Sequence, residues 1–353
     1  MSTLHEVALL RLIAQRIAGP GLPTPGEAVR HLLAVQGQDY PGALASVALR
    51  TAGRRRSDVE TALDKGDVVR SWPMRGTLHL VAARDLHWLL ELLGPRVVAG
   101  AAGRRARLGL TEADAERARD LAVVALGGVG KLRREDLLAV LAEGGVDVSG
   151  QRGYHLLWYL AQTGTLCLGP TDEGQQLFVL LDEWVPSPAR RDRAEALAEL
   201  ATRYFTGHGP ASVKDLARWA GLSVGDVRAG LAMARPELAS IEVDGAEYFL
   251  APGTPDLLAD CRREARGVFL LPGFDEFVLG YGDRSAALDP AFADRIVPGN
   301  NGMFRPTVIS DGRIVGTWGW TGRGGRRTLI ATPFTAFPDG VAAAITELAA
   351  ELP

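Results

Sequence analysis

A helix–helix–hairpin order that occurs twice in succession predicts a mixed α+β fold built from tandem modules. Residues 133–144 and 151–163 carry apolar side chains at helical spacing, and two short strands with a Gly/Pro/Asp turn follow them. The same order recurs in residues 212–220, 223–234 and 241–250. Two helices followed by a hairpin are typical of a winged helix. Because the order recurs, we prefer this interpretation to an α+β protein in which it arises by chance.

The whole sequence is predicted to contain three winged-helix modules and a β-rich C-terminal part. An earlier and less regular copy of the module is expected within residues 4–83. The predicted domains are residues 1–119, which carry a Gln-x-Gln motif, residues 120–188 and 189–255, which are the second and third winged helices, and the β-rich residues 256–353.

Local signals place the elements of these domains in order. The first domain is expected to have helices at 7–17, 25–33 and 57–63, and strands that flank Pro73 and reach 78–81. In the second, Gly144-Gly145 is a helix C-terminal signal. In the third, Ser212 and Ser223 are expected N-caps, and Asp244-Gly245 predicts a tight hairpin turn. Strands with glycine turns are expected in the last domain, before a helix near 339–352.

Composition indicates a folded protein without a membrane span. Of 353 residues, 47% are hydrophobic and 23% charged, which excludes a disordered chain. The apolar runs are much shorter than the roughly 18 residues that a membrane helix needs. The N-terminus lacks signal-peptide features, and Cys167 and Cys261 are too far apart in sequence to suggest a cysteine zinc motif. We therefore expect a soluble cytoplasmic monomer that binds no membrane.

The charge of the chain does not by itself indicate a nucleic-acid partner. The formal net charge is −3, and all but three of the 39 basic residues are arginine. Codon usage in a GC-rich genome is the simplest explanation, with selection for bidentate phosphate contacts as the alternative. If the protein binds DNA, local arginine patches must do so.

Familiar catalytic and metal-binding motifs are missing from the sequence. There is no HExxH, GxSxG, phosphate-loop or EF-hand pattern, and the six histidines are dispersed. We therefore expect neither a metal nor a cofactor, and an ordinary hydrolase or nucleotide transferase is disfavoured.

Gln36 and Gln38 form the first candidate site. They follow the apolar run of a predicted helix, and the sequence predicts that a turn at residues 39–42 ends regular structure there. Side chains at positions i and i+2 of an extended segment share a face, so the two amides can act together. A pair of solvated loop glutamines is the alternative interpretation.

Arginines form the second group of candidates. Arg323, Arg326 and Arg327 lie in a glycine-rich segment beside Trp318 and Trp320, which suits phosphate clamping or groove insertion. A solvated hairpin tip is the alternative. Further candidate phosphate contacts, each equally compatible with an ordinary exposed face, are Arg54, Arg55, Arg56, Arg104, Arg105 and Arg107.

Asp275 and His79 are ambiguous from the sequence alone. Asp275 lies between Phe274 and Phe277, and it is either a hydrogen-bonded structural residue or part of a site. The neighbouring carboxylates Asp275 and Glu276 are expected to point apart. His79 alternates with leucines on a probable strand, where a structural role is the simpler interpretation.

Four blocks of the sequence together resemble the bacterial winged-helix DNA glycosylases typified by AlkZ and YcaQ. The blocks are AVQGQD at 34–39, SWPMRGTLHLV at 71–81, LLPGFDEFVLGYGDR at 270–284 and RPTVISDGRIVGTWGW at 305–320. The first resembles the family's catalytic motif, and glutamine at position 38 is similar to the AlkZ branch. The resemblance extends from near residue 5 to about residue 335.

This resemblance implies a monofunctional glycosylase that removes N7-alkylated purines from double-stranded DNA and unhooks interstrand crosslinks. It implies self-resistance to a bis-alkylating natural product, with Gln36 and Gln38 as the catalytic pair. Residues expected to support the site are Arg75, Thr77, His79 and Asp275. A crosslinked base cannot rotate fully into a deep pocket, so we expect the winged helices to form a concave DNA-binding channel with a shallow active site. The competing interpretation is a non-enzymatic DNA-binding protein, either a transcriptional regulator or a drug-sequestering resistance protein.

Overall fold

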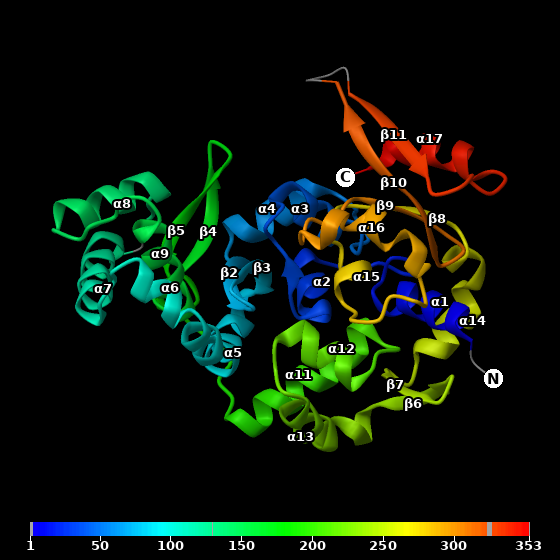
Figure 1. Cartoon of the computed structure of the whole chain (residues 1–353), viewed down its shortest axis with the longest axis horizontal. Helices are drawn as coiled ribbons and strands as arrows, with labels where there is room; N and C mark the ends of the chain where they lie inside the picture. The colour runs from blue at the N-terminus through cyan, green and yellow to red at the C-terminus, as the bar shows by residue number, and fades with distance from the viewer. Residues whose placement is uncertain (1–2, 129, 323–326, 353) are drawn as a thin grey trace. The chain divides into compact units, whose positions relative to one another are not determined.

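The computed structural model describes residues 3–128, 130–322 and 327–352 (Figure 1). By internal contacts the chain divides into two compact units. Unit 1 combines Met1–Asp58 with Leu197–Pro353, and unit 2 is the continuous segment Val59–Ala196. Both units contain helices and antiparallel sheets, so the predicted mixed α+β class is confirmed. The border of the units cuts through the predicted domain 1–119, while the division into winged-helix modules stays a prediction.

Unit 2 is built around an antiparallel sheet of strand order β3-β2-β4-β5. Its elements, after α4 (Arg56–Asp64) at the border, are β2 (Val68–Met74), β3 (Thr77–Ala82), η1 (Ala83–Asp85), α5 (Leu86–Gly100), α6 (Ala102–Arg107), α7 (Glu112–Leu126), α8 (Arg134–Glu143), α9 (Arg152–Gln162), β4 (Leu166–Asp172), β5 (Gln175–Leu180) and α10 (Leu181–Trp184). Apolar residues of α7, α9 and the sheet form one buried core. The predicted order of helix, helix and hairpin within residues 133–180 is confirmed.

The first half of unit 1 begins with a deeply buried helix. The elements are α1 (Leu4–Ala14), α2 (Pro25–Leu32), β1 (Val35–Gln36), α3 (Tyr40–Ala48), α11 (Arg193–His208), which starts before the border, α12 (Val213–Ala220), α13 (Val224–Ala234), η2 (Arg235–Glu237), β6 (Ala239–Val243) and β7 (Ala246–Leu250). Every residue of α1 from Val7 to Ala14 is buried. Residues of α1 share one core with residues of β7, α14 and β9.

The second half of unit 1 contains a four-stranded antiparallel sheet of order β11-β10-β9-β8. The elements are α14 (Thr254–Ala265), β8 (Val268–Leu271), α15 (Glu276–Leu279), η3 (Pro290–Phe292), α16 (Ala293–Ile296), η4 (Pro298–Asn300), β9 (Thr307–Ser310), β10 (Arg313–Thr321), β11 (Thr328–Pro333) and α17 (Val341–Glu351). Val341 and Ile345 of α17 pack against Leu270 and Val308 of the sheet, and Figure 1 shows α17 beside the β10–β11 hairpin. The strands and the final helix α17 agree with the elements expected here, although helices occupy at least as much of this region as strands do.

The predicted capping and turn residues act as expected. Ser212 accepts a hydrogen bond from the Asp215 backbone in a capping box, and Ser223 accepts one from Asp226. Asp244 and Gly245 both have positive φ, at 51° and 75°, which a two-residue hairpin turn with matching twist requires. These local signals therefore determine where the paired helices and the hairpin begin and end.

Two local predictions are wrong. The predicted turn at residues 39–42 instead starts α3, because Asp39 takes the N-cap position and Pro41 lies in the first turn, where its missing N–H is harmless. The strand expected after β8 is the short helix α15, and the side chain of Asp275 accepts from the Phe277 backbone at its N-terminus. At α15 the capping side chain of Asp275 overrides the strand tendency of its neighbours, whereas Asp39 makes no side-chain cap and Pro41 favours the helical backbone of the first turn.

Within the described ranges, no helix is both long and apolar enough to cross a lipid bilayer.

Candidate active site

Gln36 and Gln38 meet at the end of β1, just before α3. The Gln36 side chain is buried and that of Gln38 is exposed. The Nε2 of Gln36 donates to Oε1 of Gln38 at 3.3 Å, so the two amides do share a face as the i, i+2 spacing predicts. The motif is therefore a connected pair with one buried and one accessible member.

Backbone contacts fix the orientation of both amides. Gln36 Oε1 accepts from the backbone N–H of Gly37 at 2.8 Å and of Gln38 at 3.3 Å. Because these donors require an oxygen, the Nε2 group of Gln36 must face Gln38, which in turn presents its own oxygen to that donor. The second lone pair and the NH2 group of Gln38 are left for solvent or substrate.

A buried carboxylate holds the backbone of this motif. Glu276 in α15 is fully buried, and its Oε1 accepts from the Gln36 backbone N–H at 3.1 Å. Its Oε2 accepts from Trp219 Nε1 at 2.8 Å, with His208 Nε2 at 3.5 Å. One side chain thus connects the Gln-x-Gln loop to α11 and α12, the helices that carry His208 and Trp219.

Asp275 takes part in a buried ion pair beside Glu276. Arg50 donates from Nη1 and Nη2 to the two carboxylate oxygens of Asp275 at 2.8 and 2.9 Å, and both side chains are almost fully buried. Ser46 Oγ donates to the same carboxylate at 2.6 Å. Together with the cap on Phe277, these contacts place Asp275 in a satisfied structural network.

Gln15 joins the two carboxylate sites. Its Oε1 accepts from Arg50 Nη2 at 2.7 Å, and its Nε2 donates to the Glu276 backbone oxygen at 3.1 Å and to the Tyr281 hydroxyl at 2.9 Å. All of these groups are buried. Burial strongly raises the pKa of Tyr281, so its hydroxyl stays protonated and donates to the His208 backbone oxygen at 2.7 Å. The network therefore has matched donors and acceptors at each of these contacts.

Sequence reasoning missed Gln15, Arg50, Glu276 and Trp219 as parts of the site. Only the adjacency of Asp275 and Glu276 was a signal, and the two carboxylates do point to different partners. The contacts join positions up to 266 residues apart, which no local pattern reveals.

The other predicted supporting residues lie together in unit 2, at the turn between β2 and β3. Arg75 Nη2 lies 3.2 Å from His79 Nε2, and His79 Nδ1 lies 2.8 Å from the Thr77 backbone oxygen. His79 is fully buried, and Arg75 has a positive φ of 54°. These contacts agree with the structural interpretation of His79.

The predicted DNA-binding arginines near residue 55 have different surroundings. Arg54 is exposed, whereas Arg56 at the start of α4 is partly buried. Arg55 is exposed and forms an ion pair with Asp58 at 3.2 Å. Arg54 and Arg55 are therefore the exposed members of this group.

The arginines of the glycine-rich segment are only partly described. Arg323 and Arg326 lie outside the described residues, and Arg327, just before β11, is exposed. Trp318 and Trp320 meet edge to face with ring centroids 6.2 Å apart. The indole N–H of Trp318 donates to a β8 carbonyl at 2.9 Å, whereas Trp320 is 43% exposed. An aromatic ring is therefore available on the strand that leads to this segment.

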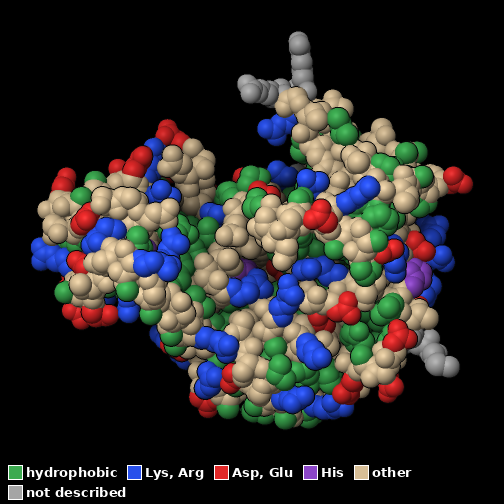
Figure 2. All heavy atoms as spheres, in the orientation of Figure 1, with side chains coloured by type: hydrophobic (Ala, Val, Ile, Leu, Met, Phe, Trp, Pro, Cys, Tyr) green, Lys and Arg blue, Asp and Glu red, His purple; other side chains and the backbone are tan. Residues whose placement is uncertain are grey.

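Basic side chains are not gathered in one place on the visible face. Figure 2 shows Lys and Arg spread over it, with acidic side chains among them. A DNA contact on this face must therefore use local groups. In the part of the chain that the structure describes, no three His, Cys, Asp or Glu side chains are placed to hold a metal ion.

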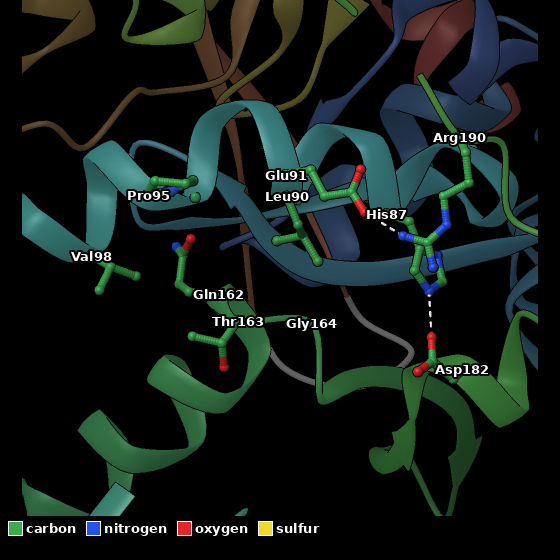
Figure 3. A pocket seen from close by; sticks show the side chains of 11 residues that line it. His87, Leu90, Glu91, Pro95, Val98, Gln162, Thr163, Gly164, Asp182 and Arg190 are labelled. Atoms are coloured by element: carbon green, nitrogen blue, oxygen red, sulfur yellow. Dashed lines mark hydrogen bonds and ion pairs between the residues drawn. The ribbon is translucent and has the colours of Figure 1, made fainter. Parts of the chain in front are cut away.

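A cavity of about 460 Å³ lies in unit 2, between one face of α5 and the end of α9 (Figure 3). His87 Nε2 lies 2.8 Å from Asp182 Oδ1, and Glu91 pairs with Arg190. Figure 3 shows the Gln162 carboxamide extending from α9 toward α5, and neither of its polar atoms has a partner among the described residues. None of these residues was a predicted site residue.

Comparison with known proteins assigns the chain to a family. The family model described as "DNA glycosylase AlkZ-like" matches residues 29–353. An interstrand DNA cross-link repair glycosylase of Streptomyces sahachiroi is 27% identical over 343 residues, which cover 94% of this chain and 90% of that protein. The solved structure of Streptomyces sahachiroi DNA glycosylase AlkZ has a TM-score of 0.83 at 25% identity, and the match covers 99% of this chain and 96% of that one. The chain therefore belongs to the AlkZ-like family of DNA glycosylases.

Proposed function

We propose that this glycosylase hydrolyses the N-glycosidic bond of N7-alkylated purines in duplex DNA, and that it thereby unhooks interstrand crosslinks as a monofunctional enzyme. The observation that carries the proposal is the hydrogen-bonded pair of Gln36 and the exposed Gln38. Two neutral amides suit a reaction in which the leaving group needs no acid. The name of the Streptomyces relative, a cross-link repair glycosylase, supports the same substrate class.

The charge of the damaged base explains why amides suffice. Alkylation at N7 gives the purine a formal positive charge, so the electrons of the C1′–N9 bond leave with the base and make it neutral. Water oxygen forms the new bond to C1′, and the water proton passes to solvent. The enzyme must hold that water and stabilise an oxocarbenium-like transition state.

Within the pair, Gln38 would hold the attacking water. Its oxygen accepts from Gln36 and has a second lone pair for a water proton. Gln36 cannot rotate freely, since its own oxygen accepts from two backbone amides. The carbonyl dipole of Gln38 is thereby oriented before the substrate arrives, so little reorganisation is needed in the transition state.

The buried Glu276 carboxylate adds an electrostatic contribution. It lies one hydrogen bond from the Gln36 backbone and is shielded from solvent. The charge of its neighbour Asp275 is balanced by Arg50. By accepting from the Gln36 backbone N–H, Glu276 holds the loop dipoles in one orientation, so little reorganisation is needed as positive charge develops in the transition state.

The decisive experiment measures base release from a duplex that contains one N7-methylguanine. Abasic sites are detected by alkaline strand cleavage, with an N7-linked interstrand crosslink as the second substrate. We expect the wild-type protein to release the methylated base and leave undamaged guanine in place. Gln36→Ala combined with Gln38→Ala should abolish release, with DNA affinity nearly unchanged.

Gln175→Ala, an exposed glutamine of β5, is the matched control and should keep wild-type rates. Release at the wild-type rate by the double variant would contradict the assignment of the pair. Tight binding to DNA with no release from either substrate would instead favour the non-enzymatic alternative.

We further propose that the activity protects its host from a bis-alkylating natural product. A strain that lacks the gene should then lose more viability with a bifunctional N7-alkylating agent than with its monofunctional analogue. Equal sensitivity of the deleted and complemented strains to the bifunctional agent would refute this role.

A further inference from the structure

A second pocket in unit 2 has aromatic walls and a basic mouth. Its volume is about 270 Å³, and it is lined by Gly76, Ala101, Arg104, Tyr154, His155 and Trp158. We call it the α6–α9 pocket, because Arg104 lies on α6 and the three rings lie on α9. The arginine-rich α6 was a candidate phosphate contact in the sequence, and the site of Gln36 and Gln38 does not use it.

Packing holds the rings of the pocket in place. Trp158 is buried, and its indole N–H donates to the Gly76 backbone oxygen at 3.3 Å. His155 stacks on Trp158 with ring centroids 5.1 Å apart, and Tyr154 meets Trp72 edge to face. Tyr154 nevertheless keeps 43% of its surface exposed. A flat ligand therefore finds a rigid aromatic surface, which reduces the entropic cost of binding.

His155 gives the pocket a polar group. The residue lines the pocket and is only 4% exposed, and its ring stacks on that of Trp158. Burial lowers the pKa of His155, and the charges of Arg104 and Arg105 lower it further. Its ring is therefore neutral near pH 7, with one donor and one acceptor, as the edge of a nucleobase requires.

Arg104 supplies positive charge at the mouth. It is exposed and donates to the neutral side chain of Gln151, and no described carboxylate lies within ion-pair distance of it. Its neighbour Arg105 differs, because it pairs with Glu112 at 3.6 Å and lies over the ring of Tyr159. The charge of Arg104 is therefore available for a phosphate.

We propose that the α6–α9 pocket binds one unstacked nucleotide of the DNA, with its base against Tyr154 and Trp158 and its phosphate at Arg104. Base stacking on aromatic side chains beside a basic group is how proteins hold single-stranded nucleic acid. A bare phosphate fits less well, because a neutral histidine and the rings of Tyr154 and Trp158 offer it few donors. The inference rests on the proposed function only in that DNA is the ligand, and it concerns binding rather than excision.

The test compares undamaged duplexes that differ by one unpaired nucleotide. Fluorescence anisotropy gives the affinity of the full-length protein for a fully paired duplex and for the same duplex with a single bulged adenine. Tyr154→Ala should weaken binding to the bulged duplex by about tenfold, the size of one stacking contact, and binding to the paired duplex less than about twofold. Tyr154→Phe keeps the ring and should bind both duplexes like the wild type.

Arg104→Ala should reduce the slope of log affinity against log salt by about one for the bulged duplex, since one phosphate contact is lost. Arg119→Ala, which removes an exposed arginine of α7 in the same unit, is the matched control and should not change the preference for the bulge. Circular dichroism confirms that each variant is folded.

Equal loss of affinity for both duplexes in Tyr154→Ala, or no loss for either, would overturn the proposal. Base release from N7-methylguanine, measured on the same wild-type preparation, keeps the two conclusions separate. Release without a Tyr154-dependent bulge preference refutes the pocket alone, and the preference without release refutes the proposed function alone.

Discussion

The carboxamide of Gln36 has backbone donors on one side and Gln38 on the other. Its oxygen accepts from two N–H groups, and its Nε2 donates to Gln38. The two glutamines are therefore not equivalent, although they are the same residue type two positions apart. Gln36 fixes the orientation of the Gln38 carboxamide, and Gln38 presents that carboxamide to solvent.

Because the two glutamines differ in this way, replacing each of them with glutamate should reduce the rate of base release to a different extent. Gln36→Glu replaces the donor to Gln38 with an oxygen, so two oxygens face each other and the orientation is lost. Gln38→Glu keeps an acceptor in place. We expect kcat for N7-methylguanine release to fall roughly tenfold more in Gln36→Glu, about 1.4 kcal/mol, from one lost hydrogen bond.

Single-turnover kinetics on the same duplex measures this ratio, and Gln175→Glu in β5 serves as the charge control. Equal kcat values for the two variants would show that the orientation of Gln38 does not depend on Gln36.

We expect a substitution of Glu276 to affect both the stability of the protein and the rate of excision. Glu276→Gln has one oxygen for two donors, the Gln36 backbone and Trp219. One N–H then faces an NH2 group, which lowers the free energy of unfolding by about 1–3 kcal/mol. Excision should slow as well, because the Gln36 backbone loses the acceptor that holds the loop in one orientation.

Urea unfolding and single-turnover excision measure the two effects separately. Glu143→Gln removes an exposed carboxylate of α8 and should change neither quantity. Unchanged excision in a Glu276→Gln protein that has lost stability would restrict Glu276 to a purely structural role.

At the scale of elements, buried ion pairing joins α1, α3 and α15 around the loop that carries Gln36 and Gln38. Arg50 connects Ser46 of α3, Asp275 at the cap of α15 and Gln15 after α1. Removing one partner of such a buried pair leaves an uncompensated charge, which costs about 3–5 kcal/mol. The fold therefore holds the short helix α15 in one position, and with it Glu276.

A substitution in the cavity between α5 and α9 should stabilise the protein rather than destabilise it. Both polar atoms of the Gln162 carboxamide are buried without partners among the described residues (Figure 3). Gln162→Met keeps the shape and removes this penalty, so we expect the free energy of unfolding to rise by about 1 kcal/mol or more. Thermal unfolding monitored by circular dichroism measures the change.

Gln176 in β5 is the matched control, because its Oε1 accepts from Arg70 at 2.8 Å. Gln176→Met should destabilise the protein. A loss of stability in Gln162→Met as well would indicate that water or a ligand in the cavity bonds the carboxamide.

At the scale of the whole molecule, stability should depend on pH through His31. Its Nε2 lies 2.6 Å from the Ala14 backbone oxygen and connects α2 to α1. Burial lowers the pKa of His31 to about 4 from its usual 6.5. Between these values the unfolded chain binds the proton and the folded chain does not, so stability falls as pH decreases from 6.5 to 4.

His31→Gln keeps a donor for Ala14 and removes the titration. The wild-type protein should lose more stability than this variant between pH 6.5 and 4.5, which chemical denaturation at each pH measures. Parallel losses in the two proteins would assign the acid sensitivity to other groups.

Unit 1 is formed from two segments that lie far apart in the sequence. Unit 1 joins the first segment of the chain to the last, with unit 2 inserted between them. The predicted domains follow the sequence linearly, because periodicity and turn signals operate over a few residues. Contacts between distant segments, such as Gln36 with Glu276, leave no such signal.

The elements with strong local signals, and the shared face of the two glutamines, can be predicted from the sequence alone. Caps at Ser212 and Ser223, the Asp244-Gly245 turn and the i, i+2 spacing of Gln36 and Gln38 act within a few residues, so the chain specifies them locally.

The residues that support the pair become apparent only in the folded chain. Folding places Glu276 on the Gln36 backbone and Arg50 on Asp275, and it leaves Gln38 accessible while Gln36 is buried. The reason is physical: a buried carboxylate is stable only where donors from distant segments surround it, and that condition exists only in the folded chain.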